Sequence, residues 1–111
     1  MAWRRIVREV RPNTGVPFHE ASDDAKAYIA STYESNGKST SFTITYSNDN
    51  LTKFKTRIFN NESSRNEFVA DLTIRAIGTD HAAHCSSNNT TKTIVEAVSY
   101  THLTLPTTPY V

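Results

Sequence analysis

The sequence TSFTITYSNDNLTKFKTRIF, residues 40–59, has the pattern of a β-hairpin and is the strongest indication of the fold. Its first part, Thr40–Tyr46, alternates apolar and hydroxyl side chains with a period of two, which is typical of a half-buried strand. The polar run Ser47–Asn50 favours a turn, since serine, asparagine and aspartate side chains bond to nearby backbone groups. The return strand is therefore predicted over Leu51–Phe59.

Alternation divides the side chains of this hairpin between two faces. On the first strand, Phe42, Ile44 and Tyr46 share one face. On the return strand, we expect Phe54 and Ile58 to face the core. We expect the basic residues of that strand to face solvent: Lys53, Lys55 and Arg57.

A strand and a helix are predicted before the hairpin. Trp3–Val10 carries apolar residues on both faces, which is typical of a strand covered on two sides. Ser22 is a good helix N-cap, and the apolar residues after it recur with helical spacing. Gly37 readily adopts the left-handed conformation that follows a helix, so we expect this helix to end near Asn36.

A capped helix and a short strand are predicted after the hairpin. Ser64 and Glu67 have the spacing of a capping box, in which each side chain satisfies a free backbone N–H. Gly78 and the β-branched residues before it weaken this helix, so we expect a kink or a two-piece helix. The run Lys92–Glu96 is predicted to be the last strand.

The predicted order is strand, helix, strand, strand, helix, strand. This is the α+β, ferredoxin-like split β-α-β pattern, with a four-stranded antiparallel sheet and two helices on one face. The segment FNNESSRNEFVAD, where the hairpin leads into the capped helix, resembles the dimeric α/β-barrel group, which includes antibiotic-biosynthesis-type monooxygenases. The resemblance is one of topology and covers residues 1–97, which we interpret as one domain. It implies a homodimer in which two sheets close a barrel around a cavity.

The last segment, Val98–Val111, has a different character. Its string VSYTHLTLPT resembles the frame translation of a transposon-based sequencing adapter, a tail that recurs on unrelated metagenomic reading frames. We therefore interpret residues 98–111 as a non-native tail that packs poorly, with Glu96 as the last secure residue. The rest of the chain is similar in general character to small proteins from phage and bacterial metagenomes.

Composition narrows the classes of function. Twelve basic residues stand against 11 acidic ones, whereas nucleic-acid-binding proteins show a clear basic excess, so no nucleic acid partner is expected. A single cysteine excludes an internal disulfide framework. No signal peptide or long apolar run is found, so we expect a cytoplasmic protein without a membrane partner. The one basic cluster is interpreted as a solvated strand edge or as subunit salt bridges: Arg4, Arg5, Arg8 and Arg11.

The sharpest chemical constellation is Asp80, His81, His84 and Cys85, of which His81, His84 and Cys85 share one face of a helix. Imidazole and thiolate together suit zinc or copper. Structural zinc usually takes four ligands in spaced pairs, however, and no second pair follows. Cys85 is equally interpreted as a small buried apolar residue. We therefore predict no metal and no cofactor, and keep these three residues as the alternative metal site.

Two other sets are candidates for function. His19 and Tyr46 are candidates for acid–base catalysis in a cavity, although a loop histidine is more often a solvated surface residue. Trp3, Phe42 and Phe54 are candidates for the lining of a pocket for a small apolar ligand, although their spacing equally suits a core.

These patterns favour a non-catalytic module that self-associates as a homodimer and has a binding or structural role. The alternative is a cofactor-independent, monooxygenase-like enzyme or a dimeric barrel that binds a small apolar ligand. The two hypotheses differ in the interior, since a closed apolar cavity reached by His19 or a tyrosine favours the alternative.

Overall fold

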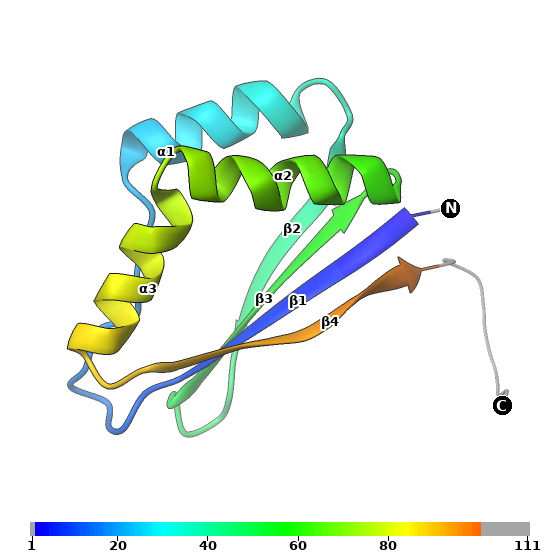
Figure 1. Ribbon diagram of the computed structural model, residues 1–111. Coiled ribbons are helices and arrows are strands. Elements are labelled where there is room, and N and C mark those ends of the chain that lie inside the picture. The colour runs from blue at the N-terminus through cyan, green and yellow to red at the C-terminus, as the bar shows by residue number, and fades with distance from the viewer. Residues whose placement is uncertain (1, 101–111) are drawn as a thin grey trace, which may run out of the picture.

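The computed structural model describes residues 2–100, which form an antiparallel sheet and a layer of helices (Figure 1). The four strands lie in the order β2-β3-β1-β4, so the α+β class and the antiparallel sheet are confirmed. The π-helical element η1 continues α1 directly. The elements are β1 (Ala2–Val10), α1 (Asp23–Ile29), η1 (Ala30–Glu34), β2 (Ser39–Tyr46), β3 (Thr52–Phe59), α2 (Glu62–Ile74), α3 (Ile77–Ser87) and β4 (Thr91–Tyr100).

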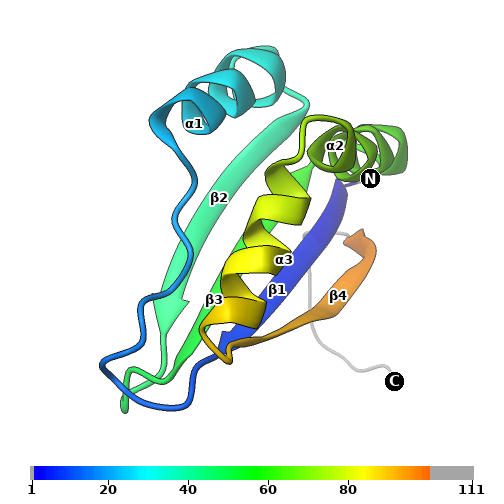
Figure 2. The ribbon, with the colours of Figure 1, turned by 60° about the vertical axis from the view of Figure 1, so that its left-hand side comes forward.

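The helical segment after the hairpin consists of two helices, α2 and α3. The prediction of two helices in total is therefore wrong for residues 2–100, although a kink or a two-piece helix was expected in this segment. The break falls at Ala76, whose φ of 63° is left-handed, and not at Gly78. The β-branched Thr73 and Ile74 weaken the last turn of α2 just before it. After the break, α3 leaves α2 at a steep angle and lies over β1 (Figure 2).

The helix caps only partly follow the predictions. Ser22 caps α1, because its hydroxyl accepts the N–H of Ala25 at 3.1 Å. The prediction that Ser64 and Glu67 form a capping box is wrong, since Asn61 is the N-cap of α2 and its side chain accepts the N–H of Ser64 at 2.8 Å. Asparagine caps a helix as well as serine does, so the local sequence does not distinguish Asn61 from Ser64 as the N-cap. Gly37, with φ of 80°, lies beyond η1 as expected.

The register of β3 directs the opposite set of side chains inward from the set predicted. Phe59 is fully buried against Tyr33 and Phe68, whereas Phe54 and Ile58 pair with arginines of β1 on the outer face. The expectation that Phe54 and Ile58 face the core is therefore wrong. Side chains alternate with a period of two, so taking Phe59 into the core reverses the whole strand. The inward pairs of β1 and β3 are Trp3–Phe59, Arg5–Arg57, Val7–Lys55 and Glu9–Lys53.

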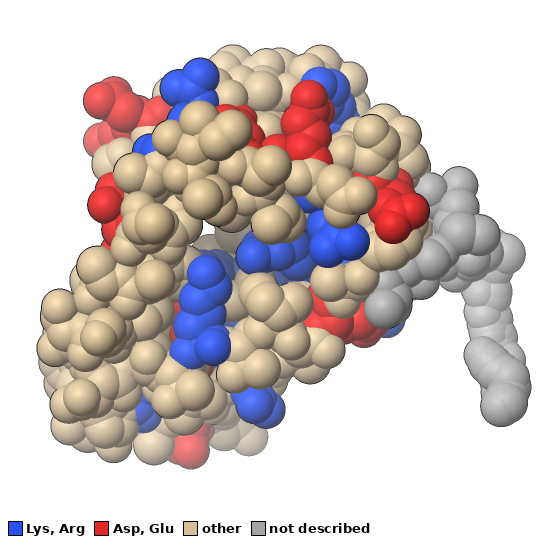
Figure 3. All heavy atoms as spheres, in the orientation of Figure 1, with Lys and Arg blue, Asp and Glu red and all other residues tan. Residues whose placement is uncertain are grey.

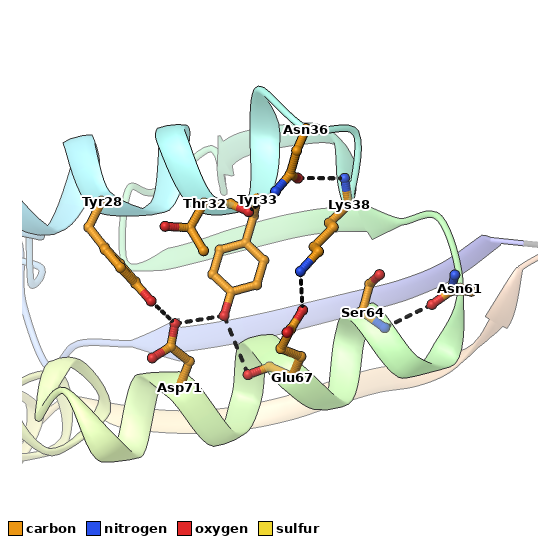
Figure 4. Close-up of polar contacts among 9 residues, drawn as sticks. All are labelled: Tyr28, Thr32, Tyr33, Asn36, Lys38, Asn61, Ser64, Glu67 and Asp71. Atoms are coloured by element: carbon orange, nitrogen blue, oxygen red, sulfur yellow. Dashed lines mark hydrogen bonds and ion pairs between the residues drawn. The ribbon is translucent and has the colours of Figure 1, made fainter.

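A small aromatic core and a set of polar bonds join the helices to the sheet. The hydroxyls of Tyr28 and Tyr33 both donate to the Asp71 carboxylate, the second at 2.7 Å (Figure 4). Nearby, Lys38 pairs with Glu67 at 2.8 Å. These bonds hold α1 and η1 against α2. The core comprises Tyr33, Phe59 and Phe68, with Trp3, Tyr28, Ile29 and Leu72 packed against it.

The last strand runs beyond the end predicted for it. Val98, Ser99 and Tyr100 continue the pairing of β4 with β1, so the first three residues of the predicted tail belong to the sheet. Residues 101–111 lie outside the described residues, and the poor packing of the tail stays a prediction. Among the described helices, none combines the length and the apolar character needed to cross a membrane.

Candidate functional site

A cleft of about 480 Å³ lies between the inner face of the sheet and the helices. Figure 3 shows it as a hollow near the centre of the molecule, with lysine and arginine side chains along it. Among the described residues, Glu20 and Glu34 are the acidic side chains that line it. The cleft is therefore strongly cationic in a chain whose net charge is only +1. Its basic residues are Arg5, Lys26, Lys53, Lys55, Arg57 and Lys92.

One wall of the cleft is apolar. It is formed by Phe42, Ile44 and Tyr46 of β2, which are 41%, 42% and 54% exposed although they lie on the inner face of the sheet. Ile29 of α1 and Leu72 of α2 add to the lining. The cleft thus combines a cationic sheet surface with an apolar wall, a combination suited to an amphiphilic ligand.

The loop between β1 and α1 closes one side of the cleft, and Arg11 anchors it. The buried Arg11 guanidinium donates to the carbonyl of Asn50 at 3.0 and 2.6 Å and to that of Val16 at 2.5 Å. It also packs over the ring of Phe18, 4.3 Å from the centroid. These contacts fix the loop and bring the next residue, His19, to the cleft.

Two of the buried cations in the cleft have partners within the protein. Arg57 donates to Glu34 at 2.9 Å and to the hydroxyl of Ser39 at 3.2 Å. Lys53 donates to the carbonyl of His19 at 3.3 Å. These residues are 8% and 5% exposed respectively, and their bonds offset the loss of hydration.

Arg5 and Lys92 are different, because neither makes a hydrogen bond or an ion pair with any described residue. Both are partly buried, and both line the cleft. Burial lowers the pKa of Arg5, and the positive charge of Arg57 lowers it further. Burial also lowers the pKa of Lys92, with Arg5 as the next cause. Each is thus a cation in a place that disfavours positive charge.

Glu9 lies beneath this surface with its side chain fully buried. Its Oε2 lies 2.6 Å from Nζ of Lys55 and 2.6 Å from Nε2 of His81. Burial by itself raises the pKa of Glu9, but the bond from His81 and the charge of Lys55 outweigh it and bring the pKa to about 2. The carboxylate is therefore ionised in the folded protein. Its Oε1 has no hydrogen-bond partner among the described residues.

Histidines and a cysteine surround this carboxylate. The ring of His19 stacks on that of His81, with 4.6 Å between the ring centroids. It also meets the ring of His84 edge-on, with 5.3 Å between the centroids. Burial, with His81 as the next cause, lowers the pKa of His19 to about 4. Cys85 is buried, and its thiol lies within 4.8 Å of the donor atoms of His81 and Glu9.

The structure brings together some of the residues that the sequence suggested and separates others. Of the alternative metal trio, His81 and Cys85 meet at Glu9, while His84 lies outside that group. His19 and Tyr46 both line the cleft but are not hydrogen-bonded to each other, and Phe42 lines the cleft too. Phe54 lies on the outer face, and Trp3 packs beside the core.

Sequence reasoning missed the residues that give the site its charge. The sequence pattern assigns Arg5 to a solvated strand edge or to subunit salt bridges and directs Lys55 to solvent, and it does not single out Glu9 or Lys92. A signal did exist for Glu9, since it shares a strand face with Trp3 and Val7, and a strand covered on both sides buries that face. The basic cluster of β1 is split by the sheet, with Arg5 inward and Arg8 exposed.

The chain was also compared with known proteins. No protein-family model, curated protein or solved structure matches it. A function therefore has to be inferred from the cleft and its side chains.

Proposed function

We propose that the protein binds a small organic anion in the cleft. The observation that carries the proposal is the pair Arg5 and Lys92, partly buried cations that make no hydrogen bond or ion pair with an acidic side chain among the described residues. Charges removed from water are normally paired, because an unpaired buried charge is costly. A bound carboxylate, sulfonate or phosphate supplies the missing partner through charge-assisted hydrogen bonds.

The apolar wall indicates the rest of the ligand. A volume of about 480 Å³ lies within the roughly 300–1,000 Å³ typical of small-molecule sites. Phe42 and Ile44 expose apolar surface directly beside the cations. The proposed ligand therefore has an anionic head over the sheet and an apolar or aromatic body against β2. A wholly apolar ligand fits less well, because it leaves the cations without partners.

We favour binding over catalysis for the same cleft. The monooxygenase-like alternative calls for a closed apolar cavity reached by His19 or a tyrosine. The lining is instead rich in charge, and His19 is neutral near pH 7, because burial lowers its pKa to about 4. A neutral imidazole there suits packing against a ligand.

We also propose that the fold is a variant of the ferredoxin-like arrangement. The strand order β2-β3-β1-β4 is the one that two interlocked β-α-β units produce. In this interpretation α2 and α3 together take the place of one crossover helix. The break between them gives α3 its position over Glu9 and so helps to form the site.

The experiment compares two probes of matched shape, 2-naphthalenesulfonate and the neutral 2-naphthol, by isothermal titration calorimetry. We expect the sulfonate to bind and the naphthol to bind at least about tenfold more weakly, since a hydrogen bond to a charged group contributes about 1.5–3 kcal/mol. Arg5→Met and Lys92→Met each weaken sulfonate binding by a similar factor. Arg8→Met removes the same charge from the exposed face of β1 and is the matched control. Equal binding of the two probes, or equal effects of the Arg5 and Arg8 variants, would refute the proposal.

A further inference from the structure

We propose that Glu9, His81 and Cys85 form a binding site for a divalent transition metal ion, with zinc as the best fit. Their donor atoms all lie within 4.8 Å of one another, and all three side chains are buried. The donors come from two elements, since Glu9 is on β1 while His81 and Cys85 are one turn apart on α3. Thiolate, imidazole and carboxylate are the ligands that zinc takes in proteins. Three protein ligands leave a fourth position for water or an anion.

The Glu9 carboxylate gives an independent reason for a cation at this place. Its side chain is fully buried, and Oε1 has no hydrogen-bond partner among the described residues. Buried polar atoms are nearly always satisfied, and an ionised oxygen without a partner is among the most costly exceptions. A metal ion bound to Glu9 satisfies this oxygen without any new side chain.

The ammonium of Lys55 occupies the place beside the Glu9 carboxylate that a metal ion would take. It lies 2.6 Å from Oε2 of Glu9 and neutralises the carboxylate. The Lys55 side chain also lines the cleft and is 19% exposed, so it has room to turn away from Glu9. We infer that a metal ion displaces Lys55 from Glu9 and leaves the ammonium in the cleft. The stacked ring of His19, 4.6 Å from that of His81, covers the site from one side.

The test uses the full chain, reduced and freed of metal by a chelator, with Co²⁺ as a spectroscopic stand-in for zinc. We expect one equivalent of Co²⁺ to bind and to give a thiolate-to-cobalt charge-transfer absorption, which Zn²⁺ then removes. Cys85→Ser abolishes this absorption, because Cys85 is the single cysteine of the chain. Glu9→Gln and His81→Gln weaken Co²⁺ binding by at least about tenfold, the loss seen when even a supporting partner of a ligand is removed.

His84→Gln is the matched control, since it removes the same type of side chain from the same helix outside the donor group. It leaves the absorption and the affinity unchanged. Cys85→Ser preserves the Glu9–Lys55 pair, so circular dichroism is expected to show a native fold, and Zn²⁺ raises the Tm of the wild type but not of this variant. The absence of a charge-transfer band, a stoichiometry of half an equivalent from bridging of two chains, or equal losses for His81 and His84 would overturn the proposal.

The metal site adjoins the anion cleft and shares Lys55 and His81 with its lining, but the two sites are separable by experiment. Arg5 lies outside the donor group, so Arg5→Met is expected to weaken naphthalenesulfonate binding and to leave cobalt binding unchanged. Cobalt binding that fails while sulfonate binding persists would overturn the metal site alone.

Discussion

Ala76, between α2 and α3, holds a backbone conformation that its side chain disfavours. Its φ is 63°, and the left-handed region costs a residue with a Cβ about 1–2 kcal/mol, whereas glycine adopts it freely. Ala76→Gly removes this strain and adds freedom to the unfolded chain, which costs about 0.4–1 kcal/mol. We expect the free energy of unfolding in urea to rise by about 0.5–1 kcal/mol on balance.

Ala82→Gly is the matched control for this change. Ala82 is exposed inside α3, where glycine destabilises a right-handed helix by about 1 kcal/mol. The two substitutions are therefore expected to have opposite signs. Destabilisation by both would argue against a left-handed junction at Ala76.

Phe59 and Phe54 test which face of β3 is buried. Phe59 is fully buried in the aromatic core, so Phe59→Ala is expected to cost about 3–5 kcal/mol of the free energy of unfolding. Phe54 lies on the outer face and is only partly buried, so Phe54→Ala is expected to lower the free energy of unfolding by about 1–2 kcal/mol when measured at low protein concentration. The reverse order in denaturant unfolding would show that the strand faces the other way.

At the scale of elements, Asp71 of α2 is the acceptor that holds α1 and η1 in place (Figure 4). Burial by itself raises the pKa of Asp71, but the bonds from Tyr28 and Tyr33 and the nearby Arg75 outweigh it and lower the pKa. Burial and the Asp71 bond conversely raise the pKa of Tyr33. The ionised carboxylate is therefore the form that joins these helices.

This lowered pKa predicts a pH dependence of stability. A carboxylate with a lower pKa in the folded than in the unfolded protein stabilises the fold fully above its unfolded pKa, about 3.9 for aspartate. That contribution is lost as the pH falls through the folded value. We expect Asp71→Asn to lower the free energy of unfolding by about 1–2 kcal/mol at pH 7. The gap from the wild type then shrinks below about pH 4.

The double variant Tyr28→Phe, Tyr33→Phe provides the control, because it removes both donors and keeps the rings. In that background, Asp71→Asn is expected to have a much smaller effect at every pH. If the pH-dependent gap persists without the two hydroxyls, it comes from another partner of Asp71, such as the Arg75 guanidinium at 3.2 Å, and the tyrosine bonds are not its cause.

At the scale of the whole molecule, the outer face of the sheet predicts self-association. The three helices of residues 2–100 pack on the inner face, and the outer face carries apolar side chains between arginines and threonines. These apolar residues are Ile6, Val10, Phe54 and Ile58. A second copy of the chain that covers this face removes them from water. Sedimentation is expected to show a homodimer at high micromolar concentration.

Phe54→Glu places a charge in the middle of the outer face and is expected to give a folded monomer. Ile44→Glu adds the same charge inside the cleft and leaves the dimer intact. A monomeric wild type with an intact fold would remove both the dimer and the barrel hypothesis.

Local patterns in the sequence were sufficient to predict where the strands and most helices lie. The alternation in residues 40–59 predicted the hairpin, and the apolar pattern of Trp3–Val10 predicted a strand covered on two sides. The Ser22 cap and Gly37 were recognised because a helix end depends on a few adjacent backbone groups. About half of the site was also named, since His19, Tyr46, His81 and Cys85 carry chemistry visible in their residue types.

The α+β class follows from local sequence, because the period of apolar side chains is a property of neighbouring residues. Which face of β3 is buried depends on tertiary packing, because both faces of this alternating strand carry apolar side chains and the surface that packs against the strand selects one of them. That choice turned Lys53, Lys55 and Arg57 inward and created the cationic cleft. It also brought Lys55 to Glu9, which lies 46 positions earlier in the sequence. Helix α3 then adds His81 and Cys85 beside the same carboxylate. Contacts between strands and helices so far apart in sequence depend on register and packing, which no local pattern specifies.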